Sequence, residues 1–98
     1  MASSKEFKDF ILEQLRGLEN ILCKPMMGEF LLYCNGILFG GIYDDRFLIK
    51  KTNSNKKYAL SEEIPYKKAK PMYLVENVDD VEYLQGLINI TCDDLKQK

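Results

Sequence analysis

The middle of the chain interleaves lysines with tyrosines, and no other pattern in the sequence is a stronger candidate for binding chemistry. The residues concerned are Lys50, Lys51, Lys56, Lys57, Tyr58, Tyr66, Lys67, Lys68 and Lys70. Lysines beside exposed rings are typical of single-stranded nucleic-acid sites, where cations contact phosphates and rings stack on bases. A loop rich in lysine is more often simply solvated surface. Residues 50–70 are therefore candidates for contact with a partner, with direct nucleic-acid binding as the less favoured use and plain solvated surface as the favoured alternative.

Charge is distributed unevenly along the chain, although the formal net charge is −1. Residues 50–70 contain seven basic and two acidic residues, whereas residues 71–98 contain two basic and six acidic ones. The near-neutral total argues against a protein whose main role is to hold a phosphate backbone. The two segments could pair within one chain or between two copies, and on this ground a homodimer is a hypothesis.

Three acidic pairs, Asp44-Asp45, Asp79-Asp80 and Asp93-Asp94, raise the question of a metal or paired-carboxylate site. The chain has no histidine, which removes the commonest general base and transition-metal ligand. In order along the chain, the pairs suit a turn, a helix N-terminus and a solvated helix face. We predict no metal, no cofactor and no catalytic site.

The cysteines Cys23, Cys34 and Cys92 are odd in number and contain no C-x-x-C pair. Cys34 lies beside a predicted turn and is expected to be an exposed thiol, whereas Cys23 and Cys92 occupy positions expected in the core. No histidine is present to activate a thiol nucleophile. Reduced thiols and the lack of an apolar signal segment in residues 1–8 predict a cytoplasmic protein.

Composition predicts a single domain over residues 1–98. Hydrophobic residues make up 46% of the chain and charged residues 30%, an ordinary balance for a folded protein. The longest uncharged run, residues 30–43, is broken by Gly36, Gly40 and Gly41 and is shorter than the roughly 20 apolar residues of a membrane span. We therefore predict no contact with a membrane.

Apolar spacing predicts a helix near each end of the chain. Ser3 to Glu6 fits the S-x-x-E capping box, and an apolar stripe continues from there to about Leu18. Near the other end, Asn77 is the expected cap of a helix that runs to about Lys96. Its first turns are expected to contain Asp79, Asp80 and Glu82. Its apolar stripe consists of Val81, Leu84, Ile88, Cys92 and Leu95.

Between the helices, alternation and turn residues predict a three-stranded antiparallel meander. Its strands are residues 29–34, 37–43 and 46–51. Asn35-Gly36 predicts a type I′ turn, and Asp44-Asp45 separates the last two strands. Gly40-Gly41 predicts a bulge, a bend or a close approach by the first helix. Residues 21–24, ahead of Pro25, are expected to edge the sheet or lead into it.

The remaining segments are less regular. Residues 53–57 predict a loop, and one short helical turn is expected around residues 61–63. Residues 72–75 predict a short strand that returns to the sheet opposite the meander. The predicted fold class is α+β: a two-layer domain whose antiparallel sheet, built on a three-strand meander, is covered by the N- and C-terminal helices.

The meander also carries a resemblance to a known family. The run Lys24-Pro25-Met26-Met27-Gly28-Glu29-Phe30, then Leu32-Tyr33, Asn35-Gly36, Phe39-Gly40 and Asp44-Asp45-Arg46-Phe47 to Lys50, resembles the N-terminal domain of the TfoX/Sxy family. Met27 and Glu29 stand where the family pattern has Phe and a second Gly. The similarity covers nearly the whole chain, and only residues 51–66 match poorly.

This resemblance implies an α+β domain linked to transcriptional regulation of natural competence, the uptake of DNA, and it does not imply a catalytic site. We therefore predict a non-enzymatic regulatory domain that acts through protein–protein contacts, with the transcription machinery as its partner. The alternative is direct nucleic-acid binding through residues 50–70. Salt-dependent retention on DNA distinguishes the two, because phosphate contacts weaken steeply as salt rises.

Overall fold

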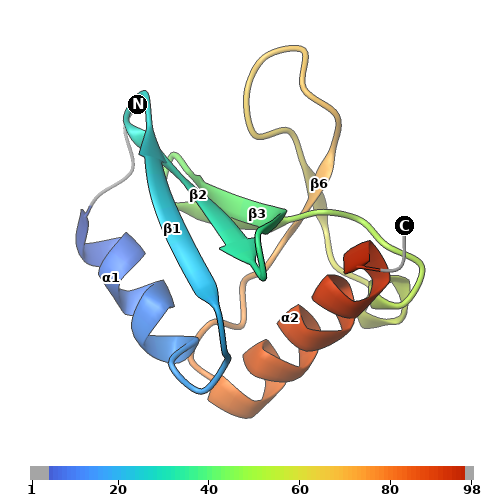
Figure 1. The fold of residues 1–98 in the computed structure, drawn as a ribbon. Coiled ribbons are helices and arrows are strands. Elements are labelled where there is room, and N and C mark those ends of the chain that lie inside the picture. The colour runs from blue at the N-terminus through green and yellow to red at the C-terminus, as the bar shows by residue number, and fades with distance from the viewer. Residues whose placement is uncertain (1–4, 97–98) are drawn as a thin grey trace.

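The computed structural model describes residues 5–96, which form two α-helices, one short 3₁₀-helix and six strands (Figure 1). In chain order the elements are α1 (Lys5–Gln14), β1 (Ile21–Met26), β2 (Glu29–Cys34), β3 (Ile37–Tyr43), β4 (Arg46–Ile49), η1 (Asn55–Tyr58), β5 (Glu62–Glu63), β6 (Met72–Leu74) and α2 (Val81–Lys96). The strands form one antiparallel sheet in the order β1-β2-β3-β4-β6-β5. The predicted α+β class is confirmed. Neither helix of the described part is long and apolar enough to cross a membrane.

Two-residue turns connect the first four strands. Asn35 and Gly36 have φ angles of 51° and 81°, as a type I′ turn requires, so the predicted tight turn is confirmed. Met27-Gly28 and Asp44-Asp45 use the same pair of positive φ angles. Because β1 pairs along its whole length with β2, the meander has four strands rather than three.

Both helices lie on one face of the sheet, which we call the helix side (Figure 1). The buried helix-side residues from the N- and C-terminal segments are Ile11, Leu15, Leu84, Leu87 and Ile88. The sheet contributes Leu32, Phe39, Ile42, Phe47 and Ile49. Burying an apolar side chain of this size stabilises the fold by about 1.5–3 kcal/mol, so this cluster is the main source of stability.

The first helix is shorter than the sequence predicts. It ends at Gln14 rather than at Leu18, and Leu15 and Leu18 reach the core from the turns that follow. Gly17 lies in this stretch, and glycine is a poor helix former because its backbone loses the most freedom on folding. The expected capping residue Ser3 lies outside the described residues.

The last helix begins later than predicted, at Val81. Asp80 caps it in place of Asn77, since Asp80 Oδ1 accepts a hydrogen bond from the N–H of Tyr83 at 3.1 Å. Asp79 and Asp80 therefore precede the helix instead of lying in its first turn. The predicted end at Lys96 agrees with the structure.

The pairing of β2 with β3 contains the bulge that the two glycines of β3 predict. The register shifts between Leu32 and Tyr33, which leaves Phe39 without a partner on β2. The close approach at this point comes from the neighbouring strands and not from the first helix. A Cβ atom at Gly41 would lie 2.6 Å from a backbone carbonyl oxygen of β2.

The segment after the meander differs most from the prediction. The third predicted strand ends at Ile49 rather than at Lys51. The helical turn expected around residues 61–63 is wrong, because β5 occupies this position and pairs with β6. Strand β6 pairs with β4, with Leu48 facing Leu74, so it extends the meander at its edge rather than lying opposite it.

The helical turn is found earlier, in η1, where the buried side chain of Asn55 organises the loop. Asn55 Oδ1 accepts the N–H of Thr52 at 2.9 Å, and Nδ2 donates to the Lys50 carbonyl at 2.9 Å and to Thr91 Oγ1 of α2 at 3.0 Å. Two of these hydrogen bonds are buried and the third is partly buried, and together they hold the loop firmly against the last helix.

Candidate functional site

The face of the sheet away from the helices, which we call the outer face, is formed by side chains that alternate with the helix-side core. Its residues on β1–β3 are Leu22, Lys24, Met26, Glu29, Leu31, Tyr33, Leu38, Gly41 and Tyr43. The register places Leu22, Tyr33 and Leu38 side by side across three strands. Leu22 is 51% exposed, and the Lys24 ammonium lies 5.3 Å from the centre of the Tyr33 ring. The outer face thus presents apolar and aromatic groups without a helix over them (Figure 1).

Tyr43 lies where the outer face meets the loop of residues 64–71. Gly41 has no side chain to fill the space beside it, and a Cβ there would lie 2.8 Å from Cε2 of the Tyr43 ring. The Tyr43 ring also contacts that of Tyr66, with 6.1 Å between ring centres and a tilt of 52°. Burial, and to a lesser degree the nearby Tyr66 and Glu29, raises the pKa of the Tyr43 phenol. Tyr43 is buried, whereas Tyr66 is 61% exposed.

A pocket of about 630 Å³ lies between β3, the end of β4 and the loop of residues 64–71. Its apolar and aromatic lining includes Leu38, Tyr43, Pro65, Tyr66, Ala69 and Met72. The cations in the lining are Lys50, Lys51 and Lys70. Binding pockets in proteins are roughly 300–1,000 Å³ in volume, apolar for the most part, with a few polar groups that orient the ligand. This pocket has both properties.

Arg46 attaches the loop wall of the pocket to the sheet. Its Nη1 donates to Glu63 Oε1 at 2.9 Å, and its Nη2 donates to the Pro65 carbonyl at 3.3 Å. Its Nε donates to the Tyr43 carbonyl at 3.2 Å. One guanidinium therefore connects the turn between β3 and β4 with the strand and loop that follow, and it holds the pocket in shape.

The lysines of the pocket are not equivalent. Lys51 Nζ lies 3.0 Å from Glu62 Oε1 and 5.7 Å from the centre of the Tyr73 ring. Lys50 and Lys70 have no ion-pair partner among residues 5–96. The pocket lining contains no acidic side chain. The site is therefore a positively charged rim around an apolar hollow.

The structure divides the basic segment that the sequence singles out. Lys50, Lys51, Tyr66 and Lys70 meet at the pocket, and Lys67 and Lys68 are exposed on the same loop. By contrast, Lys56, Lys57 and Tyr58 belong to η1, beside α2. The Tyr58 ring packs against Tyr83 at 5.4 Å and against the core cluster, so it does not lie beside Tyr66.

Several residues of the site escape the sequence analysis. Tyr33, Leu38 and Tyr43 lie on the outer face, and Arg46 builds the pocket wall. The two-residue alternation of β3 indicates that Leu38 and Tyr43 point away from the helix-side core once Phe39 and Ile42 are assigned to it, with the bulge supplying the odd residue. No local signal in the sequence indicates the contacts of Arg46.

The acidic pairs have structural positions. Asp44-Asp45 forms a turn, as predicted, and Asp80 caps α2. For Asp94 the predicted position on a solvated helix face is wrong. Its carboxylate accepts the Ser54 N–H at 2.7 Å and the Ser54 hydroxyl at 2.8 Å. Residues 5–96 contain no cluster of three or more histidine, cysteine or acidic side chains suited to a metal ion.

The cysteines also require a correction. Cys34 is not an exposed thiol: it is 3% exposed and forms a disulfide with Cys92, which joins the end of β2 to α2. Both side chains face the helix side, with their Cα atoms 6.5 Å apart. The expectation of reduced thiols is therefore wrong for this pair. Cys23 is free and half-buried, and burial raises the pKa of its thiol.

Comparison with known proteins places these features in a family context. The model of the TfoX N-terminal domain family matches residues 13–87, a range that includes the whole sheet and the pocket. The chain is also similar to an uncharacterized 12.7 kDa protein in the trpE 5′ region of Spirochaeta aurantia. The two are 27% identical over 94 residues, which cover 93% of this chain and 82% of that protein.

Proposed function

We propose that this chain, which belongs to the TfoX N-terminal domain family, is a non-enzymatic regulatory domain that binds a protein partner through its outer face and pocket. The family is linked to the regulation of competence. The observation that carries the proposal is the helix-free outer face, whose apolar and aromatic side chains continue into a pocket with a lysine rim. Such a combination of apolar centre and polar rim is typical of protein interfaces.

The pocket chemistry supports binding rather than catalysis. Its lining contains lysines and tyrosines but no carboxylate, thiol, serine or threonine. Nucleophilic catalysis by serine, threonine or cysteine needs such a nucleophile beside a base that activates it. The lining of this pocket offers neither that kind of nucleophile nor a carboxylate base. The proposed partner is a component of the transcription machinery, which implies that the protein acts in the cytoplasm.

Site-specific photocross-linking in the native cell tests this proposal. A cross-linking amino acid replaces Leu38 on the outer face, and in a matched control it replaces Glu82, which is exposed on α2. We expect one discrete protein adduct from position 38 and none from position 82. Equal labelling from both positions, or adducts from position 82 alone, would contradict the assignment of the outer face as the interface.

Direct nucleic-acid binding is the second candidate function, and the exposed Tyr66 ring beside three lysines favours it. Such a ring can stack on a base while the cations contact phosphates. Retention on single-stranded DNA is the measurement. Strong retention that falls steeply between low and moderate salt would favour this function, whereas retention near background would leave the protein interface as the better explanation.

A further inference from the structure

We propose that the pocket binds an acidic peptide segment of the partner, with one aromatic or large aliphatic side chain inserted as an anchor. The inference rests on the proposed function and gives the chemistry of its partner. The three observations behind it are the shape of the pocket, the charge around it and the place of the remaining lysines.

The shape of the pocket suits a single anchor side chain. Leu38 and Tyr43 from β3 and Met72 from β6 supply apolar surface, and Tyr66 stands at the mouth with most of its ring exposed. The loop wall is attached through Arg46, so the hollow exists before a ligand arrives. Interfaces concentrate their binding energy where an aromatic or aliphatic side chain fills such a preformed pocket.

The charge around the pocket suits carboxylates. Lys50 and Lys70 line it without an ion-pair partner among the described residues. Lys51 already holds a carboxylate of this chain, since Glu62 lies 3.0 Å from its ammonium. Acidic residues on both sides of an anchor side chain would meet these lysines at the rim. Such complementary charge increases the rate of association and selects the partner.

The place of the other lysines argues against a nucleic-acid strand as the occupant. A strand needs a row of cations that follows its backbone. Here Lys56 and Lys57 lie in η1 beside α2 and do not line the pocket, whereas Lys50, Lys51 and Lys70 do, and Lys67 and Lys68 are exposed on the pocket loop. The charge at the pocket is thus confined to its rim and its loop, which matches a short acidic segment better than an extended phosphate chain.

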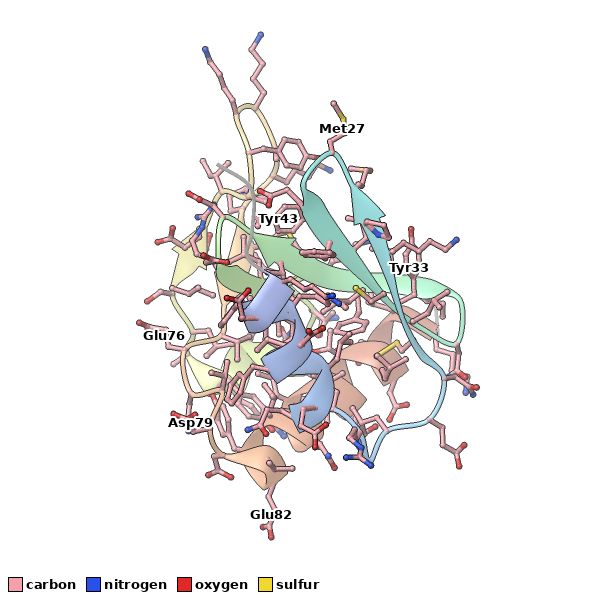
Figure 2. All side chains as sticks on the ribbon, turned by 90° about the vertical axis from the view of Figure 1, so that its left-hand side faces the viewer. Met27, Tyr33, Tyr43, Glu76, Asp79 and Glu82 are labelled. Carbon is pink, nitrogen blue, oxygen red and sulfur yellow. A yellow bond between two sulfur atoms is a disulfide. The ribbon has the colours of Figure 1, made fainter. Side chains whose placement is uncertain are left out.

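The acidic end of a second copy is a possible competitor for the pocket. Glu76, Asp79 and Glu82 lie at the end of the molecule away from Met27 and from the loop of residues 64–71 (Figures 1 and 2). They therefore do not pair with the pocket loop of the same chain, which corrects the expectation of pairing within one molecule for these residues. A partner segment is the occupant that we propose, and self-association is an outcome that the test separates.

The test begins with a phage-displayed library of random short peptides, selected on the full chain. We expect enrichment of sequences in which Asp or Glu flanks Phe, Tyr, Leu or Met. An enriched peptide is then synthesised with two matched variants, one with the anchor changed to Ala and one with the acids changed to Asn and Gln. Each change should weaken binding at least about tenfold, or about 1.4 kcal/mol.

Protein variants show where the peptide binds. The K50E/K70E double variant should lose about tenfold or more in affinity, whereas K56E/K57E, with the same change in charge, should lose less than about threefold. Tyr66→Ala should weaken binding of the anchored peptide and leave the Ala-anchor peptide unaffected. Circular dichroism shows whether each variant is folded.

Several outcomes would overturn the inference. These are the absence of an enriched acidic motif, an equal loss with K50E/K70E and K56E/K57E, and displacement of the peptide by oligothymidylate at equal concentration. A peptide of residues 76–82 that binds better than any selected sequence would assign the pocket to a second copy instead. If the cross-link from position 38 persists while the acidic motif is absent, the protein interface stands and only the peptide chemistry is wrong.

Discussion

On the helix side of the sheet, Phe39, Phe47 and Leu84 are fully buried between the sheet and two helices, whereas on the outer face Tyr33 and Leu38 remain half-exposed. The outer face is covered only near β4, by a loop that Arg46 attaches to the strand. The helix side therefore supplies most of the stability, and the outer face leaves apolar surface for a partner. Substitutions on the two sides should separate folding from binding.

The largest predicted difference concerns two neighbours on β3. Phe39→Ala removes a fully buried ring from the helix side and should lower the free energy of unfolding by about 3–5 kcal/mol. Leu38→Ala on the outer face should cost about 1 kcal/mol or less, because that side chain is partly exposed already. Urea unfolding at neutral pH measures both values. Equal losses would show that the two faces do not differ as described.

The disulfide gives the second prediction, because it ties the sheet to α2 on the helix side. Cys92→Ser should lower the stability of the oxidised protein by about 2–4 kcal/mol, since the bridge joins residues 58 positions apart and restricts the unfolded chain. The wild type should lose a similar amount on reduction, and the variant should be insensitive to reductant. The prediction fails if reduction leaves the urea midpoint of the wild type unchanged.

The turn between β2 and β3 gives the third prediction. Gly36 has a φ of 81° and open space where a side chain would lie, so only backbone strain opposes substitution. Gly36→Val should cost about 1–2 kcal/mol, and Gly36→Asn, which tolerates this region better, should cost less. Thermal unfolding of the two variants compares them directly. Indistinguishable midpoints would count against the type I′ geometry.

The fourth prediction concerns alkaline pH and the outer face. Burial raises the pKa of Tyr43 in the folded state, so its contribution to stability is complete below the ordinary tyrosine value of about 10. That contribution is lost as pH rises above this value through the folded-state pKa. Tyr43→Phe should therefore lose less stability over this alkaline range than the wild type, with little difference at pH 7. Parallel pH profiles of urea midpoints would contradict this.

The smallest expected effect is on oligomeric state. The charge split along the sequence makes a homodimer a second use of residues 50–70, which would lie beside the acidic end of another copy when no partner segment is bound. Sedimentation at micromolar concentration should show a species of twice the monomer mass at both low and moderate salt, because salt slows the association of an interface with an apolar centre but leaves most of its affinity intact. A single monomeric species at both low and moderate salt would remove the support for a dimer.

The sequence predicts the meander well because its information is local. Asn35-Gly36 specifies a turn through the φ angles that its residues tolerate, and the flanking alternation sets the strands. The prediction fails at residues 61–63 because β5 forms only when β6 is beside it, and nothing nearby in the sequence shows that pairing. It fails at the start of α2 because Asn77 and Asp80 are both good caps, and only the fold selects between them.

For the candidate site, composition indicates the lysines and Tyr66 but not their arrangement. The role of Arg46 depends on Glu63 and Pro65 folding back across the strand, which is a tertiary contact. The disulfide is missed because an odd number of cysteines argues for free thiols, whereas the pairing depends on two helix-side positions that only the fold brings together. Contacts between distant segments are thus the part that local patterns do not contain.

The bridge between Cys34 and Cys92 closes a covalent ring that contains β3 to β6 and the exposed loop with Lys67 and Lys68. A protease that cuts after one of these lysines opens the ring but releases nothing, because the two pieces remain joined through sulfur. The nicked protein keeps its mass, apart from one added water, until a reductant separates the fragments. The loop that forms one wall of the pocket can therefore be cleaved while the two fragments stay covalently linked.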